Sequence, residues 1–163
     1  MANMDKLIAL VNSFASAVLS VGHDLGLNVT LNKSKVSPGI KVPDICTASI
    51  IGVVGAGSRG TIMIMLDNDA FSNIILTMSG GMIQPQLGED VSMSVIGELS
   101  NMIGGRALVR SALGTVDVTP PQLVTGDEIE AVKKDNPSMK SFTLPFVLQP
   151  AGGVYLVLSF KID

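Results

Sequence analysis

The sequence predicts an α+β fold in which helices pack on one face of an antiparallel sheet. Apolar residues follow helical spacing in two long segments, and several other segments show the alternation or short apolar runs of strands. The expected strands are joined by short glycine-containing turns, and such local connections favour antiparallel neighbours. A similar order of elements recurs at an offset of about 90 residues, which indicates two pseudo-symmetric halves unless the likeness arose by chance.

The first half is expected to contain two helices, a short strand and a hairpin. Leu7, Phe14 and Val21 recur at helical spacing in the first helix, which ends at Gly22 and Gly26. The expected elements are a helix at residues 5–25, a strand at 27–31, a turn at 38–39, a hairpin of 45–54 with 61–66, and a helix at 70–78 that is capped by residues 67–69 and closed by glycines 80–81.

The second half repeats this order with a longer helix and a second hairpin. Acidic residues occupy the first turn of the helix, and Gly114 follows its last residue. The expected elements are a helix at residues 89–113, short strands at 116–118 and 122–125, a charged loop at 126–137 with room for one helical turn, and a hairpin of 142–148 with 154–160. Apolar terminal strands such as the one at 154–160 would be hazardous if they were left as exposed edges, which weakly favours pairing with a second chain.

Composition narrows the class of protein. A length of 163 residues with 47% hydrophobic and 15% charged residues fits one globular domain, residues 1–163, and excludes intrinsic disorder. A net charge of −3 and 4% aromatic residues argue against nucleic-acid binding. One cysteine and one histidine exclude an intramolecular disulfide and a His-based zinc site. No signal-peptide pattern and no apolar run of ~18 residues is found, so a cytoplasmic protein without membrane insertion is expected.

Two local patterns and two single residues could suggest ligand or reactive sites, but all four have simpler structural explanations. Residues 55–60 fit G-x-G-x-x-G, yet a strand rather than a helix follows, so a hairpin turn is expected. The acidic run at residues 67–69 is expected to cap a helix rather than bind a cation. Cys46 is expected to be a small buried hydrophobe, and His23 to be structural or solvent-facing.

The helix at residues 89–113 is the most informative segment, because its two faces differ in chemistry when it is projected at about 100° per residue. The residues expected on its buried arc are Val91, Val95, Ile96, Leu99, Met102, Ile103 and Ala107. Those expected on a narrow opposite stripe are Ser94, Glu98, Asn101 and Gly105, flanked by Gly97 and Gly104. A carboxylate and an amide are therefore expected side by side on a face of small residues.

Gly97, Gly104 and Gly105 need an explanation, because a glycine inside a helix costs about 1 kcal/mol relative to alanine. One explanation is that they let a bulky partner approach the helix backbone closely. The other is that the adjacent pair ends or kinks the helix, or lets it pack against another element. On the sequence alone the two explanations have equal weight.

The pattern Ser94-x3-Glu98-x2-Asn101, followed by Met102-Ile103-Gly104-Gly105, resembles the S/D-x3-E-x2-N signature of the CheC/CheX/FliY phosphatases of bacterial chemotaxis. The likeness runs over nearly the whole chain, and one full motif makes the CheX type the most similar. The resemblance implies a CheC-like fold, a homodimer that pairs through sheet edges, and hydrolysis of the aspartyl phosphate of the response regulator CheY.

The resemblance also implies roles for individual residues. Asn101 would orient the attacking water, and Glu98 would contact the regulator at its active-site lysine. The residues expected to contact the partner are Ser94, Gly97, Gly104 and Gly105. Magnesium would belong to the regulator, so that this chain needs no cofactor and no metal ligands. This agrees with the chemistry, since phosphoryl transfer depends chiefly on positioning and electrostatics.

Two features depart from the family pattern. Arg106 stands where members often carry Asn, which leaves local packing or a secondary contact as its role. The first helix holds Asp5-x3-Ala9-x2-Asn12, which is either a decayed second motif with Ala in place of Glu or a coincidence. The alternative function is therefore a non-catalytic module that docks a receiver domain or a flagellar-switch partner. A dimerising fold without an active face is the third option.

Overall fold

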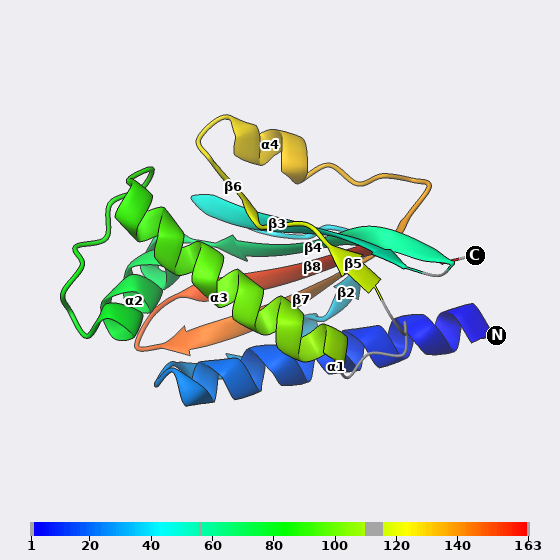
Figure 1. The fold of residues 1–163 in the computed structure, drawn as a ribbon, viewed down its shortest axis with the longest axis horizontal. Coiled ribbons are helices and arrows are strands. Elements are labelled where there is room, and N and C mark those ends of the chain that lie inside the picture. The colour runs from blue at the N-terminus through cyan, green and yellow to red at the C-terminus, as the bar shows by residue number, and fades with distance from the viewer. Residues whose placement is uncertain (1, 56, 110–115, 163) are drawn as a thin grey trace.

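The computed structural model describes residues 2–55, 57–109 and 116–162, and Figure 1 shows their arrangement. The helices are α1 (Ala2–Asp24), α2 (Asn68–Ser79), α3 (Asp90–Val109) and α4 (Glu128–Val132), with a 3-10 turn, η1, at Lys33–Lys35. The strands are β1 (Asn28–Leu31), β2 (Ser37–Pro38), β3 (Thr47–Gly55), β4 (Ser58–Leu66), β5 (Val116–Val118), β6 (Gln122–Thr125), β7 (Lys140–Gln149) and β8 (Gly153–Ile162). The end of the predicted helix, residues 110–113, and Gly114 lie outside the described residues.

The eight strands form one antiparallel sheet, as predicted. Its order is β1-β7-β8-β4-β3-β5, while β2 also pairs with β7 and β6 also pairs with β3. Strand β8 lies in the middle, where Leu156 is opposite both Ile64 of β4 and Leu144 of β7. Residues 154–160 therefore do not form an exposed edge, because both sides of this strand are paired, and they give no support to pairing with a second chain. The ends of the strand order are β1 and β5.

The predicted pair of related halves is confirmed by the connectivity. Each half runs helix, two short strands, and a long hairpin: α1-β1-β2-β3-β4 and α3-β5-β6-β7-β8, with α2 between them. The halves exchange their short strands, since β1 and β2 pair with β7 whereas β5 and β6 pair with β3. The last strands of the two halves, β4 and β8, then join at the centre. This reciprocal exchange relates α1 to α3 as equivalent helices.

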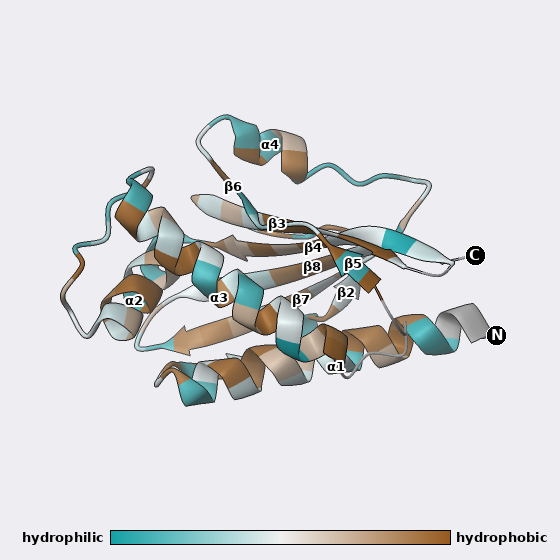
Figure 2. Ribbon diagram, in the orientation of Figure 1, coloured by the Kyte–Doolittle hydropathy of each residue, from teal (hydrophilic) through white to brown (hydrophobic). Residues whose placement is uncertain are grey.

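The main core lies between the sheet and the helices α1, α2 and α3, which cover one face as predicted (Figure 1). Phe14 of α1, Ile74 of α2 and Ile96 of α3 are each at most 1% exposed, and all pack into the same cluster. By length and composition α1 could also cross a membrane. Its apolar side instead packs against the sheet, where hydrophobic residues dominate the central strands (Figure 2).

The other face of the sheet has a smaller core of its own, covered in part by α4. Its buried members are Ala48, Met63, Met65, Val124, Ile129 and Val157. Residues 62–66 form a continuous apolar run because this part of β4 is buried on both faces. The predicted charged loop at 126–137 indeed contains one short helix, and Ile129 anchors it to the sheet.

The predicted caps of α2 and the predicted β3–β4 hairpin are confirmed. Of the predicted turn at residues 38–39, however, Pro38 belongs to β2, and Gly22 lies inside α1 rather than at its end. The Asp67 carboxylate accepts hydrogen bonds from the Ala70 amide at Oδ1 (2.9 Å) and from the Gly153 amide at Oδ2 (2.9 Å), so it caps α2 and ties it to β8. Gly80 ends α2 in the left-handed conformation with φ of 62°. The G-x-G-x-x-G segment is the β3–β4 hairpin and leads into a strand, so it lacks the helix that a dinucleotide fingerprint requires.

Candidate functional site

Helix α3 carries the predicted stripe on its outer face. Ser94, Glu98, Asn101 and Gly105 are all exposed, and we call these four residues the α3 stripe. The residues that face the sheet and are buried include Ile96, Leu99, Ile103 and Ala107. This division follows from the helical period, since positions four and seven residues apart return to the same side. An acidic and an amide side chain, one turn apart, are thus offered together to a partner.

The start of α3 is fixed by local hydrogen bonds, which hold the stripe in place. The buried Ser92 hydroxyl accepts from the Gln86 amide (3.0 Å), so the loop before α3 is tied to its first turn. The Met93 backbone amide donates a hydrogen bond to the Glu89 carbonyl (2.9 Å), so the helical hydrogen bonds extend back to the residue before Asp90. The helix then runs without interruption through Gly104 and Gly105 to Val109, so the glycine pair does not end it.

The three glycines of α3 have different surroundings. A Cβ atom at Gly104 would lie 3.3 Å from Cδ1 of Ile51, so this buried glycine lets α3 pack closely on β3. A Cβ atom at Gly97 would make an ordinary contact of 3.8 Å with Leu123, whereas one at Gly105 would meet nothing within 4 Å. The predicted partner contact at Gly104 therefore does not fit the geometry, because its Cα faces the core. At Gly105 no packing against the described residues requires a glycine.

Arg106 joins α3 to α1. Its Nη1 donates to the Asp24 carboxylate (2.7 Å) and to the Ser20 hydroxyl (3.1 Å). The ion pair is partly exposed, so it contributes about 1 kcal/mol or less to the free energy of unfolding. Of the two roles left open for Arg106, the geometry supports local packing between the equivalent helices.

The equivalent face of α1 lacks the acidic partner. Asp5, Asn12 and Ser16 are exposed, and Ala9 is half-buried at the position that corresponds to Glu98. With the offset between Asn12 and Asn101, Ser16 corresponds to Gly105. Helix α1 therefore presents an amide without a carboxylate one turn before it, at the position that corresponds to Glu98, and its residues serve below as matched controls.

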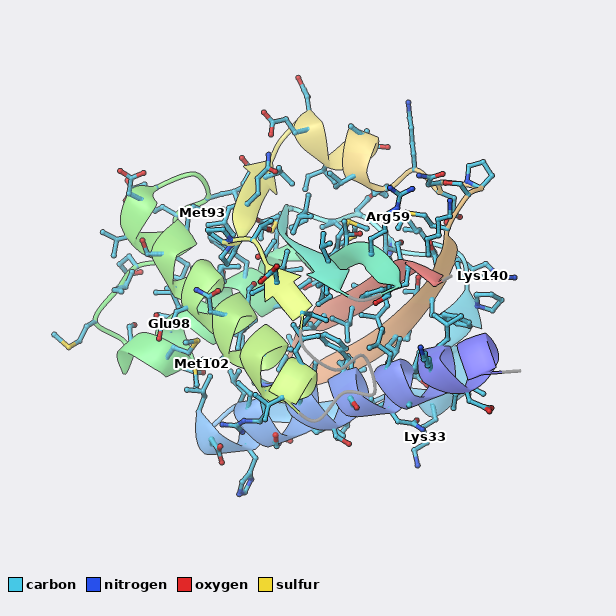
Figure 3. The ribbon with its side chains drawn as sticks, turned by 45° about the vertical axis from the view of Figure 1, so that its right-hand side comes forward. Lys33, Arg59, Met93, Glu98, Met102 and Lys140 are labelled. Atoms are coloured by element: carbon cyan, nitrogen blue, oxygen red, sulfur yellow. The ribbon has the colours of Figure 1, made fainter. Side chains whose placement is uncertain are left out.

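An apolar groove that sequence analysis did not find adjoins the α3 stripe. It encloses about 430 Å³ between the end of α2 and the first half of α3, and its lining residues are Met78, Ser79, Ile83, Val91, Ser94, Val95 and Glu98. Val91, which is predicted on the buried arc, is instead 57% exposed and lines this groove. Figure 3 shows Glu98 and Met102 projecting from α3 on the side of α2.

Other candidate groups lie away from the α3 stripe. In the described parts of the chain, no group of three or more His, Cys, Asp or Glu residues could hold a metal ion. Burial, and to a smaller degree the charge of Asp67, raises the pKa of the half-buried Cys46 thiol to about 11, so the thiol is protonated near neutral pH. A cavity of about 620 Å³ near Lys35, Lys41 and Tyr155 contains no residue of α3. The α3 stripe and this cavity are thus separate surfaces. The α3 stripe is the one that carries the carboxylate and amide pair predicted from the sequence.

The sequence matches a known family over the region that contains the stripe. The profile described as "Chemotaxis phosphatase CheX" matches residues 47–146. The "CheY-P phosphatase CheX" of Thermotoga maritima is 32% identical over 124 residues, which cover 74% of this chain and 78% of the relative.

Solved structures share the fold. The chemotaxis protein CheX from Vibrio vulnificus has a TM-score of 0.74 and 24% identity, with 93% of this chain and 99% of that chain covered. The CheX–CheY–BeF3–Mg²⁺ complex from Borrelia burgdorferi contains a chain with a TM-score of 0.71 and 19% identity, with 93% and 97% covered. Identities this low show the fold alone.

Proposed function

The chain belongs to the CheX family of chemotaxis phosphatases, and from this premise we propose that it hydrolyses the aspartyl phosphate of a CheY-type response regulator. The protein is thus a hydrolase that acts on response regulators. The observation that carries the proposal is that Glu98 and Asn101 are both exposed, one turn apart, on a helix face whose other exposed residues, Ser94 and Gly105, are small.

Asn101 acts on the attacking water in this proposal. Its carboxamide enters the active site of the regulator, where its oxygen accepts a hydrogen bond from water and holds it in line with the phosphorus. The water oxygen bonds to phosphorus, the bond between phosphorus and the aspartyl oxygen breaks, and the carboxylate leaves with the electron pair. The proton of the water passes to the phosphate product or to solvent. A carboxylate is a good leaving group, so no general acid is required.

Glu98 holds the partner rather than the water. Glu98 takes part in neither of the salt bridges found among the described residues, Arg106 with Asp24 and Lys133 with Glu130, so its exposed carboxylate is available for a cation of the regulator. We assign that cation to the active-site lysine of the regulator. Magnesium belongs to the regulator as well, which is supported by the presence of CheY, BeF3 and Mg²⁺ in the Borrelia complex.

Replacing Glu98 with Ala is expected to weaken association with the phosphorylated regulator by about 10-fold, because a hydrogen bond between charged groups contributes about 1.5–3 kcal/mol. The loss should appear mainly in KM, measured by phosphate release at increasing regulator concentration. Glu128→Ala is the matched control, since Glu128 is an exposed glutamate on α4 at the other face. A fall in kcat with no change in KM would instead assign Glu98 to the chemical step.

The wild-type assay separates the proposed function from the alternative. Phosphorylated CheY-type receiver is mixed with Mg²⁺, with and without this protein, and the loss of phosphate from the receiver is followed. Faster loss in the presence of the protein is expected. Unchanged loss together with measurable binding would support a non-catalytic docking module. Absence of both would leave a fold without an active face.

We propose further that residues 1–163 act as one domain, in the cytoplasm, as a homodimer that pairs through a sheet edge. The support for pairing is that Val54 and Val118 are exposed near the β5 edge of the sheet. Sedimentation equilibrium is expected to give twice the mass of the chain. A monomer mass across the micromolar range would contradict the dimer but not the phosphatase activity.

A further inference from the structure

The apolar groove beside α3 is continuous with the α3 stripe. Ser94 and Glu98 belong to both, because they line the groove and are exposed on the outer face. On the other wall, Met78, Ser79 and Ile83 come from the end of α2 and the segment that follows it. A partner whose active site covers Asn101 would therefore also cover this groove.

The surroundings of the groove expose apolar side chains that nothing in the described chain covers. The exposed fractions are 57% for Val91, 47% for Leu87 and 89% for Met82. Single exposed apolar residues are ordinary, but here they accompany a concave site of about 430 Å³. This volume is suited to one or two apolar side chains rather than to a long segment of chain.

The charges around the groove identify the kind of partner. The stretch that supplies the lining of the groove, residues 78–98, contains three acidic residues, Glu89, Asp90 and Glu98, and no lysine or arginine. Glu89 and Asp90 are exposed at the start of α3, next to Val91, and Glu98 lies at the other end of the groove. A complementary surface would present an apolar side chain surrounded by basic residues.

We infer that this groove is the docking site for an apolar side chain on the surface of the response regulator, flanked by basic residues and adjacent to the phosphorylation site of the regulator. The inference rests on the proposed function, since the regulator is the partner that brings its active site to Asn101. The groove supplies affinity and selects among receiver domains, while Asn101 supplies the chemistry. In protein interfaces, buried apolar contacts at the centre usually supply most of the binding energy, and polar and charged residues surround them.

The test compares Val91→Asn with Ile8→Asn. Both side chains are exposed helical aliphatics (57% and 53%), but Ile8 lies on α1, away from the groove. The probe is a CheY-type receiver loaded with Mg²⁺ and beryllofluoride, so binding is measured by calorimetry without turnover. Val91→Asn is expected to raise Kd by about 5-fold or more, and Ile8→Asn to leave Kd unchanged. In turnover the loss should fall on KM rather than on kcat.

The acidic residues at the edge of the groove, Glu89, Asp90 and Glu98, provide a second test, because their attraction to a basic partner depends on salt. The Kd of the wild-type protein is expected to rise by about 10-fold between 50 and 500 mM NaCl, and Glu89→Gln to reduce that dependence. Wild-type affinity in Val91→Asn would overturn the inference while leaving the phosphatase proposal intact. Binding by the wild-type protein without hydrolysis would overturn the phosphatase proposal, and the calorimetric comparison would still decide the docking site. Circular dichroism of each variant verifies the fold.

Discussion

Replacing Asn101 with Ala is expected to lower the rate of phosphoaspartate hydrolysis at saturating regulator by about 100-fold or more. Removal of one preorganised polar group that acts in a transition state typically costs this much, and here the amide is the only group assigned to the water. The side chain is exposed on the outer face of α3, so the free energy of unfolding should change little. Phosphate release under single-turnover conditions measures the effect directly.

Two further variants make this result specific to the amide at position 101. Asn12→Ala removes an exposed amide from the equivalent face of α1 and should leave the rate unchanged. Asn101→Asp keeps the shape of the side chain but adds a negative charge beside the anionic phosphoryl group, so it should also reduce the rate strongly. Equal rates for wild type and Asn101→Ala would remove Asn101 from the chemical step. If both also equalled the rate of the regulator alone, the docking module would be favoured.

The architecture was predictable because its signals are local. Leu7, Phe14 and Val21 define the buried side of α1 by spacing, and Asp67 and Gly80 define the ends of α2 by their capping chemistry. The exchange of short strands between the halves was not predictable, because the pairing of β1 with β7 joins residues far apart in the chain. For the same reason, the position of β8 in the middle of the sheet was not predictable from the chain order.

The position of the α3 stripe was also predictable from local signals, whereas the apolar groove beside it was not. Ser94, Glu98 and Asn101 lie on one helix, so the helical period alone predicts their shared face. The groove is formed by separate segments, α2 and α3, that meet only in the folded chain. Gly104 and Gly105 are adjacent in sequence, and only the position of Ile51 distinguishes the packed glycine from the open one.

That difference leads to the other large prediction: Gly105→Leu is expected to stabilise the fold and to abolish most of the activity. Leucine is a much better helix former than glycine, and the space around position 105 is open, so the free energy of unfolding should rise by up to about 1 kcal/mol. A bulky side chain on the stripe, one turn beyond Asn101, would hold the regulator away from the amide, and a displacement of about 1 Å can cost about 100-fold in rate.

The opposite signs of these two effects make the experiment decisive. Ser16→Leu is the matched control, since Ser16 is the exposed residue that corresponds to Gly105 on α1, and kcat/KM should be unchanged there. Chemical denaturation and phosphate release on the same preparations give both quantities. If Gly105→Leu were as active as wild type, the open glycine would have no role in partner approach, and the regulator would have to reach Asn101 from another direction. If it were less stable than wild type, the helix would need a glycine for reasons within the chain. Only a more stable and less active variant fits a helix face that accepts a less favourable residue so that another protein can come close to its backbone.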